Sequence, residues 1–119
     1  MAHKITIIKE GKADIDLVRG DTLMLTLNLK KKETEEEYIP EDGDQIIFTL
    51  RKNYKGLNND EILLQKFVDI YTSLLLEIEP EDTNNLEYGS YKYDIEFDSW
   101  DGKIDTVLQG SFKLTKEVT

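Results

Sequence analysis

Residues 88–114 read YGSYKYDIEFDSWDGKIDTVLQGSFKL, and this stretch decides the fold. Apolar and polar residues alternate along both of its halves, which is the period of a β-strand with one buried face. Asp101-Gly102 lies between the halves, and this pair is favoured in two-residue hairpin turns, in which both positions need positive φ. The stretch therefore predicts two antiparallel strands of about ten residues each, long enough to form the centre of a sheet.

A two-residue turn at Asp101-Gly102 also predicts how the two strands pair. Trp100 then faces Lys103 at the end of the ladder. The expected inward pairs are Phe97 with Thr106, Ile95 with Leu108, Tyr93 with Gly110 and Tyr91 with Phe112. The expected outward pairs are Lys92 with Ser111, Asp94 with Gln109 and Glu96 with Val107. A slip of one residue would turn the charged row inward, so the register is strongly specified.

The residues before this hairpin predict a crossover between two sheets. Leu86, Gly89 and Tyr91 have the spacing of a corner at which a tyrosine hydroxyl bonds to an upstream backbone group. We therefore interpret Tyr91 and Tyr93 as core and corner residues in preference to a platform for stacking a ligand, because the alternation buries them.

The rest of the chain also shows the strand period. Apolar residues alternate over 5–7, 15–17, 23–29, 46–50 and 74–78, a mixed run covers 62–68, and 80–85 suggests a single helical turn that begins at Pro80. Polar segments separate these runs at the intervals of a β-sandwich. The sequence predicts an all-β, immunoglobulin-like antiparallel β-sandwich of about seven strands that forms one domain over residues 1–119. The predicted core is Leu23, Leu25, Leu27, Ile46, Phe48, Leu50, Leu74, Leu76, Ile78, Tyr91, Tyr93, Ile95, Phe97, Leu108, Phe112 and Leu114.

Composition excludes several classes of function. The chain has 119 residues, a formal net charge of −10 and no cysteine. Repulsion from phosphate makes nucleic acids and anionic membranes poor partners. The missing cysteines exclude a disulfide framework and a thiolate metal site. No stretch approaches the roughly 20 apolar residues that a membrane-spanning helix needs.

The sequence offers no catalytic constellation, so we expect a protein that is not an enzyme and has no cofactor. The single histidine, His3, lies at the start of the chain, and the serines have no nucleophile-elbow context. Acidic clusters such as Glu41-Asp42-Gly43-Asp44 lack the EF-hand spacing, and we expect no metal site. Arg19-Gly20-Asp21 spells an integrin-recognition tripeptide, but a bend before the next strand is the better interpretation of three residues.

Trp100 and Tyr54 are the speculative binding residues. Trp100 lies at the expected hairpin tip, where it either folds back over the end of the sandwich or stays exposed as a contact for a partner or a sugar.

Several stretches carry a resemblance to a known family. They are RGDTLMLTLNL (19–29), IPEDGDQIIFTLRKN (39–53), LLQKF (63–67), LEIEPEDTNNLEYGSYKYDIEF (76–97) and VLQGSFKLTKEVT (107–119). In this order they resemble small immunoglobulin-like β-sandwich proteins of phages and prophages in Gram-positive bacteria, akin to the N-terminal domain of the upper-baseplate protein.

The resemblance implies a non-enzymatic structural component of a phage or prophage particle, in a baseplate, a tail or a head decoration. Such a protein is made in the cytoplasm of the bacterial host and becomes part of the virion. Its partners would be other virion proteins or further copies of itself, joined by modest polar contacts or by strand addition at a sheet edge. The alternative is a carbohydrate- or cell-surface-binding immunoglobulin-like module that uses Trp100 and Tyr54.

Overall fold

The computed structural model describes residues 5–8, 14–31, 34, 36–52, 61–71 and 74–116. Within them the chain forms β1 (Ile5–Ile8), β2 (Ile15–Val18), β3 (Leu23–Thr26), β4 (Asn28–Lys31), β5 (Gln45–Lys52), β6 (Ile62–Phe67), β7 (Leu75–Ile78), α1 (Pro80–Thr83), β8 (Gly89–Asp98) and β9 (Ile104–Thr115). The helical turn predicted after Pro80 is confirmed as α1.

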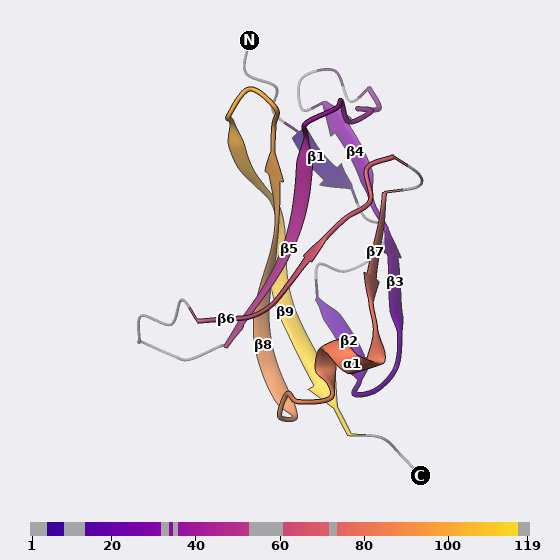
Figure 1. Ribbon diagram of the computed structural model, residues 1–119, viewed down its shortest axis with the longest axis vertical. Coiled ribbons are helices and arrows are strands. Elements are labelled where there is room, and N and C mark those ends of the chain that lie inside the picture. Colours follow the sequence, from indigo (N-terminus) through magenta and orange to yellow (C-terminus); the bar gives the residue numbers. More distant parts are fainter. Residues whose placement is uncertain are drawn as a thin grey trace.

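The strands form two layers (Figure 1). One layer is a five-stranded sheet in the order β2-β9-β8-β5-β6, and the other consists of the pairs β3-β7 and β1-β4. β8 lies in the middle of the larger sheet, as its length predicted. This architecture is the all-β, immunoglobulin-like sandwich expected from the sequence. The prediction that it is purely antiparallel is wrong, because β2 pairs with β9 in parallel at one edge of the larger sheet.

The described residues contain nine strands where about seven were expected. The run from Leu23 to Leu29 was predicted as one strand, but it is divided at Leu27, whose N–H donates to the Leu74 carbonyl at 3.0 Å. Before this point β3 pairs with β7, and after it β4 pairs with β1. The interruption thus lets one length of chain pair with two different strands.

The predicted core is correct in its main lines. Leu23, Leu25, Leu74 and Leu108 are partly buried and pack against the core, while the other predicted members are buried. Further buried apolar residues outside the prediction are Ile15, Leu17, Leu29, Tyr38, Ile47 and Val68. The Phe48 and Tyr93 rings stack with their centroids 5.5 Å apart.

The β8-β9 ladder follows the predicted register from Tyr91↔Phe112 to Ile95↔Leu108. Beyond Ile95 it shifts by one residue, so Glu96 pairs with Thr106 and Phe97 with Asp105, and the predicted partners Val107 and Thr106 are wrong. The irregularity is a β-bulge, which places one extra residue in one of the two strands.

The bulge changes the hairpin turn as well. Ser99, and not Trp100, closes the ladder, because its N–H donates to the Lys103 carbonyl at 2.8 Å. Three residues therefore form the loop, and only Gly102 has positive φ, at 91°. A three-residue loop needs left-handed backbone at its last position alone, so the predicted two-residue turn with Trp100 opposite Lys103 is wrong.

The predicted tyrosine corner is confirmed. The Tyr91 hydroxyl donates to the Glu87 carbonyl and fixes the crossover from α1 to β8. In immunoglobulin domains with a disulfide, the corner tyrosine precedes the second cysteine by two residues. Here that position is Tyr93, a buried core residue whose ring stacks on Phe48 of the neighbouring strand in the same sheet.

Arg19-Gly20-Asp21 forms a bend before β3, as predicted. Gly20 has a φ of 92°, and the Asp21 N–H donates to the Val18 carbonyl at 3.0 Å. The Arg19 guanidinium carbon lies 4.2 Å from the centroid of the Tyr88 ring, which holds this side chain against the corner region.

β6 is one of the two edge strands of the larger sheet, and β2 is the other. Its pairing with β5 is irregular between Leu50 and Arg51. Lys66 lies opposite the core residue Phe48 and reaches Asp82 of α1, with 2.8 Å between Nζ and Oδ2. A charged residue on the inward side of an edge strand and a bulge both disfavour further strand pairing.

Replacing Tyr91 by Phe tests the corner. The variant loses the bond to the exposed Glu87 carbonyl, and we expect a loss of about 1 kcal/mol in the free energy of unfolding. Tyr88→Phe is the matched control, because it keeps the ring under Arg19, and it should change stability much less. Urea denaturation of both variants measures the difference, and equal stabilities would contradict a stabilising corner.

Glu96 makes stability depend on pH. Burial, followed by a hydrogen bond with the Asp98 carboxyl, raises the pKa of Glu96 above its ordinary value. The folded state therefore binds this proton more tightly than the unfolded chain, and the associated stability is lost as pH rises through the folded pKa. Glu96→Gln should raise the midpoint of thermal unfolding at pH 7 relative to the unmodified protein.

The gain from Glu96→Gln should disappear when pH falls below the ordinary glutamate pKa, because Glu96 is then protonated in both states. Glu36→Gln, a change at an exposed loop position, controls for the general loss of one negative charge. A gain for Glu96→Gln that is independent of pH, or matched by the control, would contradict this mechanism.

Candidate interaction surface at one end of the sandwich

An acidic turn, Glu41-Asp42-Gly43-Asp44, leads into β5. The Asp44 N–H donates to the Glu41 carbonyl at 3.0 Å, and the Glu41 N–H donates to Asp44 Oδ2 at 2.8 Å. Gly43 has a φ of 94°, and a Cβ atom there would lie 3.0 Å from the Cβ of Trp100. Glycine at this position therefore permits both the left-handed backbone and the close approach of the hairpin tip.

Asp44 connects three segments through one carboxylate. It is only 3% exposed. Besides the Glu41 N–H, Oδ2 accepts the Tyr38 hydroxyl at 2.7 Å, and Oδ1 accepts the Trp100 backbone N–H at 2.9 Å. Burial and the hydrogen bond to Asp44 raise the pKa of Tyr38 well above its usual range, so this hydroxyl stays a donor at neutral pH. The carboxylate thus joins the turn, Tyr38 and the β8-β9 hairpin.

Trp100 folds back over the acidic turn and still faces solvent. Its Nε1–H donates to Glu41 Oε2 at 2.7 Å, while the side chain remains 62% exposed. The sequence left open whether Trp100 folds back over the end of the sandwich or stays exposed. In the structure the ring does both, since it is held by Glu41 and remains accessible. The structure brings Trp100 together with the acidic cluster at 41–44, whereas Tyr54 lies outside the described residues.

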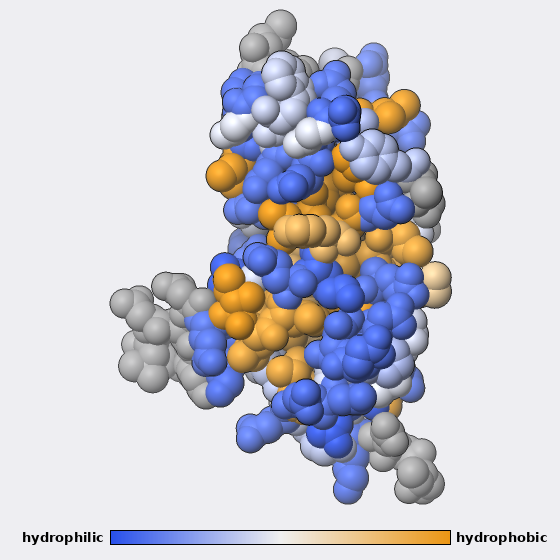
Figure 2. Space-filling model, in the orientation of Figure 1, coloured by the Kyte–Doolittle hydropathy of each residue, from blue (hydrophilic) through white to orange (hydrophobic). Residues whose placement is uncertain are grey.

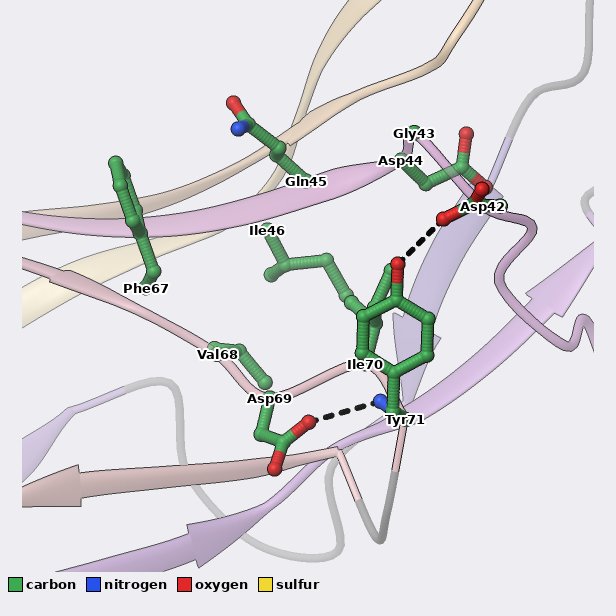
Figure 3. A pocket seen from close by; sticks show the side chains of 10 residues that line it. All are labelled: Asp42, Gly43, Asp44, Gln45, Ile46, Phe67, Val68, Asp69, Ile70 and Tyr71. Atoms are coloured by element: carbon green, nitrogen blue, oxygen red, sulfur yellow. Dashed lines mark hydrogen bonds between the residues drawn. The ribbon is translucent and has the colours of Figure 1, made fainter.

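A groove of about 460 Å³ lies between residues 42–46 and 67–71. The Val68 N–H still donates to the Ile46 carbonyl at 2.9 Å, and beyond this bond Asp69 pairs with Leu75 of β7. Figure 3 shows Phe67 and Tyr71 at its two ends, with Ile46 and Val68 between them. The Tyr71 hydroxyl donates to Asp42 Oδ1 at 2.6 Å, and its backbone N–H donates to Asp69 Oδ1 at 2.9 Å. These bonds hold an exposed ring at the mouth of the groove.

No pattern in the sequence indicates this groove. Phe67 falls in a mixed run and Tyr71 just after it, and neither position shows a pattern typical of a binding residue. Phe67 is 65% exposed and Tyr71 73% exposed. The one available signal was that two aromatic residues flank the end of an amphipathic run.

The described residues contain neither a metal-binding cluster nor a membrane-spanning helix. Among the residues that the structure describes, no group of three or more histidine, cysteine or acidic side chains is arranged to hold a metal ion. No helix in the described part of the chain is long and apolar enough to span a membrane.

Comparisons with known proteins identify no family for this chain. No protein-family model matches the sequence, and the comparison with curated proteins gives no match. A solved structure described as murine CRIg matches 97% of this chain and 99% of that chain, with a TM-score of 0.47 and 7% sequence identity. At that level the likeness carries no argument, and the fold assignment rests on the strand order and the tyrosine corner.

Asp44→Asn tests the role of this carboxylate. An amide presents an NH₂ group to at least one of the donors that Asp44 now accepts, so we expect a loss of about 2–4 kcal/mol in the free energy of unfolding. Asp42→Asn is the control, because its amide oxygen can still accept the exposed Tyr71 hydroxyl, and it should cost less than about 1 kcal/mol. Similar losses for the two variants would contradict the special role of Asp44.

Proposed function

We propose that this chain is a non-enzymatic structural component of a phage or prophage particle, in a baseplate, a tail or a head decoration, and that it acts through protein–protein assembly. The proposal combines the resemblance carried by the stretches from 19–29 to 107–119 with the surface at the end of the sandwich. The protein is made in the cytoplasm of the bacterial host and becomes associated with the virion.

The observation that carries the assembly role is a set of exposed aromatic side chains on a rigid frame. Phe67, Tyr71 and Trp100 are all more than half exposed, and each borders the turn at 41–44 or the groove beside it. Aromatic residues in such positions supply much of the binding energy of protein interfaces. The view in Figure 2 shows hydrophobic areas among charged ones on the face that includes β6.

The charge of the chain limits the kind of partner. At −10 the protein repels nucleic acids and anionic membranes. Two copies also repel each other unless cationic groups of one copy face acidic groups of the other at the contact. Modest polar interfaces with other virion proteins, or with correctly oriented copies of this chain, agree with this surface, and the Lys66 and bulge features of β6 favour loop contacts over strand addition.

The particle assignment has a direct test. Mass spectrometry of purified particles from an induced lysogen that encodes this chain should detect it in a fixed ratio to the other virion proteins. Size-exclusion chromatography with light scattering on the isolated chain measures self-association. Absence of the protein from purified particles would overturn the assignment.

A second function, binding of carbohydrate or of a cell surface, is favoured by one observation. Trp100 offers an exposed ring beside the Glu41 carboxylate, and sugars bind to such pairs through stacking and hydroxyl donation. Trp100 is the only tryptophan of the chain, so its fluorescence reports on this site alone. A glycan that binds should change that fluorescence, and Trp100→Ala should lose binding on a glycan array, whereas an unaffected Trp100→Ala variant would remove this function.

A further inference from the structure

The groove between residues 42–46 and 67–71 combines an apolar floor with negative walls. Ile46 and Val68 are buried and form its floor. Asp42 and Asp69 are exposed at its sides. None of the described residues that line it is a lysine or an arginine.

Aromatic rings stand at both ends of the groove. Phe67 and Tyr71 lie there (Figure 3), and both side chains are mostly exposed. The faces of such rings attract cations through their quadrupole, and arginine is the commonest partner in proteins. The Tyr71 hydroxyl donates to Asp42, and this bond fixes the position of the ring. The Asp42 carboxylate can still accept further hydrogen bonds, because a carboxylate has about four acceptor positions.

We propose that this groove binds an arginine side chain presented by a basic segment of a partner protein. The inference rests on the proposed function, since it names the chemistry of the partner in the assembly contact. The aliphatic stem of arginine matches the floor of Ile46 and Val68. Its planar guanidinium stacks on aromatic rings and donates to carboxylates, and it is more weakly hydrated than the ammonium of lysine.

The chain itself does not supply this group. Its two arginines are Arg19 and Arg51. Arg19 lies over the Tyr88 ring, and Arg51 forms an ion pair with Asp94 at 2.7 Å between Nη1 and Oδ2. A second copy would have to break one of these contacts, which makes a different, basic protein the better occupant.

The test titrates the isotopically labelled full chain with three short peptides that differ only at one central residue. The residue is arginine, lysine or citrulline, and ¹H–¹⁵N NMR spectra report the amides that shift. We expect the arginine peptide to shift the amide signals of residues 42–46 and 67–71. The lysine peptide should bind with at least about threefold lower affinity, and the citrulline peptide should cause no saturable shift. Higher ionic strength should lower the affinity of the arginine peptide, because salt screens its attraction to the carboxylates.

Two variants with matched controls locate the contact. Phe67→Ala should weaken the arginine peptide about two- to fivefold, while Ile62→Ala, at the other end of β6 and also exposed, should leave its affinity unchanged. Asp42→Asn keeps an acceptor for Tyr71 and should have a similar effect. Its control, Asp16→Asn on β2, should have none. The spectra themselves show that each variant is folded.

Three results would overturn the inference. These are equal binding of arginine and lysine peptides, shifts that map away from the groove, and affinities that Phe67→Ala and Asp42→Asn leave unchanged. Particle incorporation is measured separately for Phe67→Ala. If this variant enters particles normally and the peptides do not bind, the inference fails while the proposed function stands. If the arginine peptide binds as expected but the protein is absent from particles, the proposed function fails while the site stands.

Discussion

The alternating side chains of β8 hold the sandwich together. One row, consisting of Tyr91, Tyr93, Ile95 and Phe97, is buried against the other layer, and charged residues occupy the opposite face. β8 lies in the middle of the sheet, so its register also sets the positions of β5 and β9. The tyrosine corner fixes the start of this strand, and Asp44 fixes the hairpin beyond its end. Of these two anchors, Asp44 is the one that holds the aromatic surface, because it accepts the Trp100 backbone N–H.

Which side chains of a strand face the core could be predicted, because burial of one face makes apolar and polar residues alternate along the sequence. The ladder was therefore correct as far as Ile95↔Leu108, and Tyr91 was recognised as a corner residue. The bulge beyond Ile95 could not be predicted, since Asp101-Gly102 serves a two-residue turn and a three-residue loop equally well. The division of the run at Leu27 depends on a hydrogen bond to Leu74, 47 residues further along the chain, and no local pattern encodes such a contact.

The candidate site was less predictable than the fold. Trp100 was identified from its place at the hairpin, but its partner Glu41 lies 59 residues away in sequence. Asp44 looks like its acidic neighbours in the sequence, and only burial distinguishes it from Asp42. Phe67 and Tyr71 come to lie at the two ends of one groove because the chain passes from the larger sheet to Leu75 of β7 after β6. Sites built from such separations are properties of the tertiary structure.

The Lys66–Asp82 ion pair has a consequence for crowded conditions. An edge strand without obstacles can recruit identical strands one after another and so grow into a fibre. At the edge of this sandwich, a lysine on the core side tied to a neighbouring helix and a kink in the same strand interrupt that template. The β6 edge therefore resists the repeated strand pairing by which an open edge would grow into a fibre.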